Sequence, residues 1–428
     1  MIGNFLRMTM LSVFLLAPAQ VQATEVRTLK VCIETALKNQ PTIKAAQEAA
    51  IAGQGRVTQA ASPYLPQLKA STGYTESHSL GGALGDSISK SYSSTLSLNQ
   101  VLYDFGRTGN ALDAARSGAR SNERDAERVV HETVLNVKQA YFALLASKKL
   151  MLAAQKTVEQ AESHLKQAEA FFRAGSKPRF DVTRSEVDVN TAKLGMIIAK
   201  NNVRLRTIAL YNAMGMDPGG EIEVEDILSL PVNIPSMEET LAEAIKNRPE
   251  LLKAEADIDA ARARIRAEES GYLPTLSAAG SYNWAHGTSQ MGTFTGDIKN
   301  SWSAGITLSL PLFEGGLTRG KVAEARANLH GLEAQGHTFR QSVLIELNQA
   351  YADIESAKAR IEVMESSLKK SRESLELAQG RYEAGVGPSI EVTDAQVAAS
   401  NAENDHVQAL YDYQLAAARL FKAMGRRE

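Results

Sequence analysis

Large apolar residues recur every seven positions along two long stretches of the chain. They are Val130, Val137, Leu144, Met151, Val158, Leu165 and Phe172 in the first stretch, and Leu347, Ile354, Ile361, Leu368, Leu375 and Tyr382 in the second. This spacing is typical of helices that pack in coiled coils. No proline interrupts residues 107–172 or 317–382. We therefore predict two continuous helices, each about 100 Å long at the usual rise per residue, which is too long for a globular domain.

Small residues form a second stripe beside the large ones. They are Ala140, Ser147, Ala154, Ala161 and Ala168 in the first half, and Ala350, Ala357, Ser371 and Ala378 in the second. A small stripe beside a large one lets two helix backbones approach closely. We therefore expect a larger side chain at Ala154 or Ala357 to overpack the contact between helices.

Each long helix is predicted to end at a turn that contains glycine. Gly175 precedes Pro178 in the first half, and Gly385 precedes Pro388 in the second. Glycine just past a helix end and proline at the start of the next helix are common punctuation. After the first turn, large apolar residues again recur every seven positions, at Val182, Val189, Met196, Val203 and Leu210. Each half therefore predicts a long helical hairpin whose tip is the glycine turn.

Before each long helix the period changes to two, with apolar residues on one side and small polar residues on the other. Strands of about ten residues with this pattern match transmembrane barrel strands. Ser303 and Thr307 are predicted to face the lumen of such a barrel. The residues expected to face lipid are Leu276, Tyr282, Trp284, Trp302, Ile306 and Leu308.

The number of predicted strands is four, two in each half. Known transmembrane barrels begin at about eight strands, so four strands cannot close one. Either several chains each contribute strands to a shared barrel, or the sheet is one face of a soluble β-sandwich. The length of the predicted helices and the export signal described below favour the shared barrel.

The second half of the chain repeats the first. Residues 37–41 (LKNQP) return as residues 245–249 (IKNRP), an offset of 208 (249 − 41), and residues 213–215 (AMG) return as 423–425, an offset of 210 (425 − 215). The offset changes once, between Tyr64 and Phe105, where the strands are predicted. We therefore expect two repeats, residues 24–214 and 238–428, joined by a linker over 215–237. A period this long indicates a duplicated domain-sized unit and not a solenoid.

The N-terminus has the pattern of a secretory signal over residues 1–23. Arg7 precedes a short apolar run at residues 8–16, and Ala23 or Ala19 offers a cleavage site. The apolar run is too short to span a bilayer, although an uncleaved anchor is the other interpretation. Cys32 is the single cysteine, so it cannot form an internal disulfide. Val31 before it is not the small residue that lipidation needs, so Cys32 is expected to be a buried structural residue.

Composition narrows the classes of function. The formal net charge is −2, which gives no basis for binding nucleic acid. The seven histidines show no metal-ligand spacing, and the chain carries no enzyme signature. We expect no catalytic residues, no metal site and no cofactor.

Taken together, these features resemble the TolC-like outer-membrane efflux family over residues 24–428. The marks are the duplication, the Tyr-Leu-Pro at 64–66 and 272–274 before each predicted strand pair, and the motifs at 103–106 (YDFG) and 312–316 (LFEGG) after it. The resemblance implies a mainly α protein with a transmembrane β part. It also implies a homotrimer in which each chain gives four strands to one outer-membrane barrel and its helices to a long periplasmic tunnel. The partners it implies are outer-membrane lipid, a periplasmic adaptor and an inner-membrane pump, either ABC-type or proton-driven.

The resemblance also assigns roles to residues at the tips. Asp181 and Tyr382 would hydrogen-bond and help to hold the tunnel shut, although an ordinary exposed pair is the other interpretation. Residues expected to contact the adaptor are Gly175, Lys177, Arg179, Gly385 and Gly387. Lys177 and Arg179 depart from the apolar or small residues that the family usually has there. Gly387 occupies a position where relatives often carry a basic latch residue.

Two acids after the second tip are candidates for a selectivity site. Glu391 and Asp394 are three residues apart, so they share one helix face, and in a trimer they would form stacked acidic rings. The resemblance places such acids at the periplasmic entrance, where they confer cation preference. Capping of the helix N-terminus is the simpler interpretation. Arg184 occupies the position in the first repeat that is equivalent to Asp394 in the second. We therefore expect Arg184 to turn away or to pair with a carboxylate.

The favoured interpretation is a passive outer-membrane exit duct that an adaptor and a pump open and drive. A soluble periplasmic coiled-coil scaffold or adaptor is the alternative, and the four amphipathic strands argue against it. A general diffusion porin is a third possibility, but a porin is nearly all strand. The sequence does not name the cargo.

Overall fold

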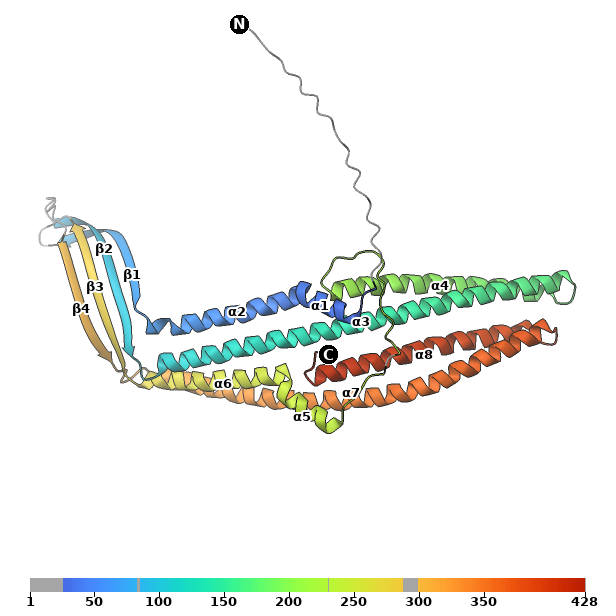
Figure 1. Cartoon of the computed structure of the whole chain (residues 1–428). Coiled ribbons are helices and arrows are strands. Elements are labelled where there is room, and N and C mark those ends of the chain that lie inside the picture. The colour runs from blue at the N-terminus through green and yellow to red at the C-terminus, as the bar shows by residue number, and fades with distance from the viewer. Residues whose placement is uncertain (1–25, 83–84, 230, 288–298, 428) are drawn as a thin grey trace, which may run out of the picture.

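The structure is a computed structural model that describes residues 26–82, 85–229, 231–287 and 299–427. The predicted signal peptide lies outside these residues. The chain is elongated, with a four-stranded sheet at one end and two helical hairpin tips at the other (Figure 1). Among the described helices, none combines the length and the apolar character needed to cross a membrane.

The helices repeat in the same order in both halves of the chain. The first repeat contains α1 (Leu29–Asn39), α2 (Pro41–Ala61), α3 (Arg107–Arg173) and α4 (Arg179–Ala213), and the second contains α5 (Met237–Asn247), α6 (Pro249–Glu269), α7 (Leu317–Glu383) and α8 (Ser389–Ala423). The start residues differ by 208 before the strands (249 − 41) and by 210 after them (317 − 107). The predicted long helices and the predicted duplication are thereby confirmed, and the change of offset falls in the strand segment.

The long helices end at the predicted glycines because the chain turns there through left-handed backbone. Gly175 and Gly385 have φ values of 73° and 76°. In the first tip the amide of Gly175 donates to the carbonyl of Phe172, and the amide of Ser176 donates to that of Phe171. This pair of bonds satisfies carbonyls that the helix end leaves free, and glycine adopts the required φ without steric cost.

The four strands form one antiparallel sheet in the order β1 (Gln67–Gly82), β2 (Gly85–Tyr103), β3 (Thr275–Gly287) and β4 (Lys299–Ser309). The pairing of β2 with β3 joins the two repeats. Its register places Ala70, Leu96, Tyr282 and Trp302 in one row across all four strands. Because side chains alternate along a strand, rows of this kind gather most of the large apolar strand residues on one face of the sheet. The next row on that face, Thr72, Ser94, Trp284 and Asn300, is mostly polar.

Two tyrosines at equivalent positions of the repeats hold the segment before α1 and the segment between α4 and α5 against the long helices. The hydroxyl of Tyr141 on α3 donates to the carbonyls of Arg27 and Glu225, at 3.2 and 2.9 Å. The hydroxyl of Tyr351 on α7 donates to the carbonyl of Pro235 at 2.6 Å. Around them lie two clusters of buried apolar residues, one for each repeat.

Cys32 is a buried residue of α1, as expected. Its side chain is fully buried in the first apolar cluster, which also contains Tyr141, Leu144 and Met214. Burial raises the pKa of its thiol to about 11. The thiol is therefore protonated at neutral pH and contributes to packing.

Candidate functional site

The two hairpin tips meet at one end of the molecule, where α3 packs against α8 (Figure 1). Side chains and carbonyls bridge from the α3–α4 hairpin to the α7–α8 hairpin. The bridges are His164 Nε2 to Ser389 Oγ at 3.0 Å, Thr393 Oγ1 to Asp188 Oδ2 at 2.9 Å, Gln167 Nε2 to Glu383 Oε1 at 2.9 Å, Gln396 Nε2 to the Thr157 carbonyl at 3.1 Å and Lys177 Nζ to the Gly387 carbonyl at 3.0 Å. We call this set of hydrogen bonds the tip joint. It links residues more than 200 positions apart.

Tyr382, at the end of α7, lies beside the hydrogen bonds of the tip joint and packs against residues of the other hairpin. Its side chain is 0% exposed. The ring lies 4.8 Å from the His164 ring and 5.5 Å from the Phe171 ring, and the Lys177 ammonium lies 5.4 Å from its centre. Three residues of the opposite hairpin therefore surround one aromatic ring.

The expected hydrogen bond between Asp181 and Tyr382 is not formed in the structure. Both residues are buried, so they are not the ordinary exposed pair either. Within the described residues, the Tyr382 hydroxyl has no hydrogen-bond partner. Burial and then the nearby Asp181 carboxylate raise the pKa of Tyr382. A neutral hydroxyl enclosed without a partner is an unfavourable arrangement that a small movement would relieve.

The residues expected to contact an adaptor have different environments. Gly175, Gly385 and Arg179 are exposed at the ends of the hairpins. Lys177 instead reaches across to the carbonyl of Gly387, which is buried. A Cβ at Gly387 would lie 3.1 Å from the Cβ of Arg381, so a side chain there would crowd the turn. The basic residue that bridges the two tips is thus Lys177 of the first tip and not a residue at position 387 of the second.

The two candidate selectivity acids lie at the start of α8, as the sequence predicted. Glu391 is half-buried and pairs with Arg381 of α7 at 3.4 Å, whereas Asp394 is exposed. Arg184 on α4 is half-buried, and its Nε has no hydrogen-bond partner within the described residues. Of the two expectations for Arg184, turning away or pairing with a carboxylate, the pairing is not formed among the described residues of one chain, and the other stays a prediction.

The strand residues expected to face lipid share one face of the sheet. The side chains of Tyr282, Trp284, Trp302, Ile306 and Leu308 are exposed, and that of Leu276 is half-buried. The register aligns Leu276 with Leu308 and Tyr282 with Trp302. Ser303 pairs with Ser281, with hydroxyls 2.9 Å apart, on the other face.

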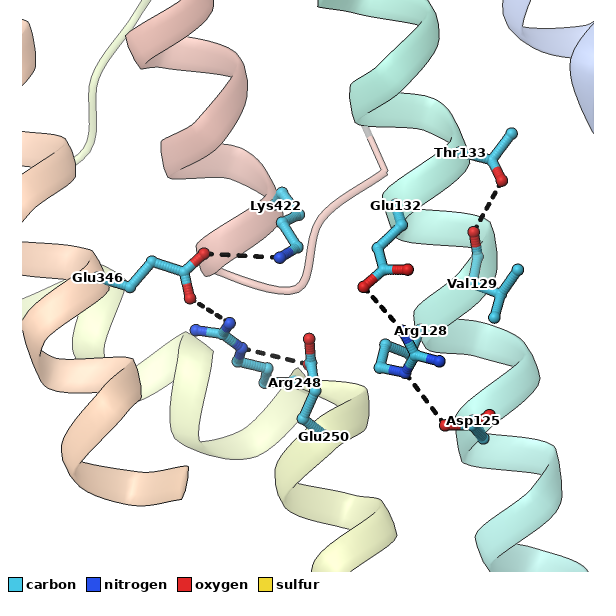
Figure 2. Close-up of polar contacts among 9 residues, drawn as sticks. All are labelled: Asp125, Arg128, Val129, Glu132, Thr133, Arg248, Glu250, Glu346 and Lys422. Atoms are coloured by element: carbon cyan, nitrogen blue, oxygen red, sulfur yellow. Dashed lines mark hydrogen bonds and ion pairs between the residues drawn. The ribbon is translucent and has the colours of Figure 1, made fainter. Parts of the chain in front are cut away.

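A further cluster of charged residues lies at mid-length, and the sequence reasoning missed it. Arg248, 5% exposed, precedes α6 and contacts Glu250 of α6 and Glu346 of α7, while Lys422 of α8 contacts Glu346 at 3.6 Å (Figure 2). Gln40 holds the equivalent position in the first repeat, where its amide donates to the carbonyls of residues 212 and 213. The repeat alignment contained the signal, because Arg replaces Gln there.

Comparison with known proteins places the chain in a family. The sequence profile of the outer membrane efflux protein family matches residues 32–216 and 240–426. The chain belongs to the outer membrane efflux protein family. The family resemblance and the expected outer-membrane location are thereby confirmed, and so is the expectation that the chain is not an enzyme.

Curated relatives cover most of the chain. It is similar to the outer membrane protein TolC of Escherichia coli, with 25% identity over 86% of this chain and 76% of the relative. It is also similar to the alkaline protease secretion protein AprF of Pseudomonas aeruginosa, with 28% identity over 90% of this chain and 82% of the relative.

Solved structures share the fold at lower sequence identity. The structure of CusC matches with a TM-score of 0.81 and 20% identity, over 93% of this chain and 92% of that one. The open state of the Neisseria gonorrhoeae MtrE outer membrane channel matches with a TM-score of 0.78 and 21% identity, over 93% and 89%. The expected combination of long helices with a small antiparallel sheet is confirmed.

Proposed function

We propose that the chain forms, as a homotrimer, the outer-membrane exit duct of a tripartite efflux or type I secretion system. The observation that carries this proposal is the incomplete sheet that has most of its large apolar side chains on one face. Three copies would contribute twelve strands (3 × 4), which exceeds the roughly eight strands that the smallest barrels need. The apolar face would then contact lipid, and the face with Ser303 and Thr307 would line the lumen.

The helices support assembly with further copies. Helix α4 carries a row of exposed apolar side chains, namely Val187, Leu194, Ile198, Leu205 and Ile208. These positions follow the spacing of a coiled-coil stripe, so they fit against a helix of a neighbouring copy. Three helical units side by side would continue the barrel into the periplasm as a tunnel.

The duct itself is passive. No part of the described chain forms a cluster of metal-ligating side chains, and the family is one of channels. A periplasmic adaptor would dock at the tips near Gly175, Arg179 and Gly385, and an inner-membrane pump, ABC-type or proton-driven, would supply the energy. Docking would compete with the tip joint because Lys177 and Gly387 belong to both regions.

Membrane insertion tests the proposed barrel. Ile306→Arg places a charge on the proposed lipid face and should cost about 2–4 kcal/mol at mid-bilayer. Thr307→Arg, one residue further along β4, places the same charge toward the lumen and should cost much less. The measurement is the yield of heat-resistant trimer in outer-membrane fractions. Equal yields from the two variants would contradict the proposed orientation of the sheet.

The acids of α8 give the proposed duct its ion preference. Glu391 and Asp394 of three copies would form stacked rings at the entrance, and rings of carboxylates attract cations. The Glu391→Gln, Asp394→Asn double variant should lose cation selectivity in planar-bilayer recordings. Because Arg381 already pairs with Glu391, most of the loss should come from Asp394.

A matched control uses two exposed acids of α7 with the same spacing. Glu362→Gln with Glu365→Gln removes the same charge farther from the tip, so selectivity should stay unchanged. Unchanged selectivity in the Glu391 and Asp394 double variant would exclude these acids as the selectivity site.

A further inference from the structure

His164 is a buried titratable side chain that the proposed duct does not use. It lies on α3, and its side chain is 6% exposed. Its Nε2 lies 3.0 Å from the hydroxyl of Ser389, the first residue of α8, and its ring packs against Tyr382 at the end of α7. One imidazole therefore contacts both helices of the opposite hairpin.

We propose that His164 makes the tip joint proton-sensitive: uptake of a proton by its buried imidazole separates the α7–α8 tip from the α3–α4 tip. The proposal rests on the proposed duct only in that these tips would be the entrance. The charges that surround the imidazole within one chain determine the direction of this response.

The groups on the opposite hairpin disfavour a positive charge on His164. Ser389 begins α8, so the imidazole faces a helix N-terminus, where the aligned peptide dipoles carry partial positive charge. The Lys177 ammonium, which lies over the Tyr382 ring, belongs to the same hairpin as His164, so its repulsion does not act across the tip joint. The nearest acid in the first turn of α8, Glu391, is paired with Arg381.

The acids that attract a charged imidazole lie on its own hairpin. Asp181 and Asp188 of α4 both favour the protonated form of His164. Arg184, a cation, lies between these two acids in the sequence of α4. Because both acids belong to α4, a proton on His164 would draw the ring toward α4 and away from Ser389 and Tyr382. The arrangement gives protonation a direction, because Asp181 and Asp188 attract the imidazolium within the α3–α4 hairpin, while the N-terminus of α8 repels it across the tip joint.

Burial agrees with this direction. It lowers the pKa of His164, and the attraction of Asp188 and Asp181 only partly opposes it. A histidine whose pKa is lowered in the packed state stabilises packing above its ordinary value near 6.5, and that contribution is lost as pH falls through the lowered value. One coupled proton changes the ratio of separated to joined tips by at most about tenfold per pH unit.

Separation can be measured directly between nitroxide labels. The positions are Ala170 of α3 and Ala398 of α8, both exposed, each changed to Cys in a Cys32→Ala background. Labelled chains are mixed with unlabelled chains in detergent, so that intrachain distances dominate the pulsed dipolar signal. We expect the population with a longer distance to grow several-fold as pH is lowered from 7.5 to 5.

His164→Gln is the decisive variant because glutamine can still hydrogen-bond Ser389 but takes up no proton in this range. It should keep the short distance at every pH. His131→Gln is the matched control, since His131 is also buried with a lowered pKa, caused first by burial and then by Arg427, but lies at mid-length. It should keep the wild-type response.

Two results would overturn the proposal. One is a wild-type distance that does not change with pH, and the other is a response that persists in His164→Gln. The readout involves neither a bilayer nor transport. A chain that conducts no ions in bilayers but opens its tips in acid would therefore contradict the duct and leave the role of His164 standing.

Discussion

The middle of the helical section and its tips are held together by different forces. At mid-length, two apolar clusters enclose large side chains such as Leu144, Met214, Leu347 and Met424. At the tips, one smaller cluster around Leu375, Tyr382 and Val392 is supplemented by the hydrogen bonds of the tip joint. Buried polar groups without a hydrogen-bond partner among the described residues occur at both levels: Nη1 of Arg248 and Nδ1 of His131 at mid-length, and the hydroxyl of Tyr382 at the tips. The rest of the Arg248 guanidinium and the Tyr141 hydroxyl do have partners at mid-length.

The difference shows which end of the helices is suited to move. Apolar packing is lost only when area is exposed to water, so the middle resists separation. Hydrogen bonds across the tip joint exchange for bonds to water or to a partner at a small net cost. A firm middle with separable tips is what a duct that opens at its entrance requires.

The largest expected effect is on the apolar packing at mid-length. Leu347→Ala removes a fully buried side chain from the second cluster, and such changes cost about 2–5 kcal/mol. The measurement is chemical unfolding of the purified protein followed by circular dichroism. Leu377→Ala, an exposed leucine of the same helix, should change stability by less than about 0.5 kcal/mol. Similar losses in both variants would remove the distinction between a packed middle and the rest of α7.

Much of this fold follows from local patterns in the sequence. The period of seven, the period of two and the glycine turns each depend on neighbouring residues, so they predicted the long helices, the strands and the tips. The contacts across the tip joint were not predictable in this way. His164 and Ser389 are 225 positions apart, and Lys177 and Gly387 are 210 apart, and no periodic signal specifies which residues of two hairpins will meet.

The predicted link between Asp181 and Tyr382 shows the same limit. The sequence placed both residues at the tips, and the structure puts the Asp181 carboxylate near Tyr382 without a hydrogen bond between them. It also places His164 against Tyr382, a neighbour that the family resemblance did not supply. Arg248 differs, because its exchange for Gln40 is visible in the aligned repeats, although the repeats alone do not show that Arg248 contacts Glu250 and Glu346.

An intermediate effect is expected from overpacking the small stripe. Ala357 is 1% exposed within the second cluster, so Ala357→Leu should cost about 1–3 kcal/mol. Ala154 was expected to behave alike, but it is half-buried and borders a groove of about 840 Å³ between α4 and α8. Ala154→Leu should therefore cost less. Crosslinking of trimers and chemical unfolding of both variants would check this order, and an equal loss would show that the groove is filled in the assembled protein.

The smallest effects come from removing one hydroxyl at each level. Tyr141→Phe at mid-length removes a hydroxyl that bonds two carbonyls, so it should lower the free energy of unfolding by about 1 kcal/mol. Tyr382→Phe at the tip removes a buried hydroxyl that has no partner within the described residues. That change should leave stability unaltered or raise it by up to about 1 kcal/mol, because a desolvation penalty disappears.

Both variants make the same chemical change, so their effects on stability can be compared directly. The expected result is a loss of stability for Tyr141→Phe and no loss for Tyr382→Phe. The shift in the thermal unfolding midpoint, measured for both proteins in the same detergent at pH 7.5, is the test. At this pH His164 is neutral by the argument above, so proton uptake does not contribute. If Tyr382→Phe loses as much stability as Tyr141→Phe, the Tyr382 hydroxyl is bonded in the assembled protein; the family resemblance implies Asp181 as the acceptor. The tips would then be latched more firmly than the tip joint of one chain suggests.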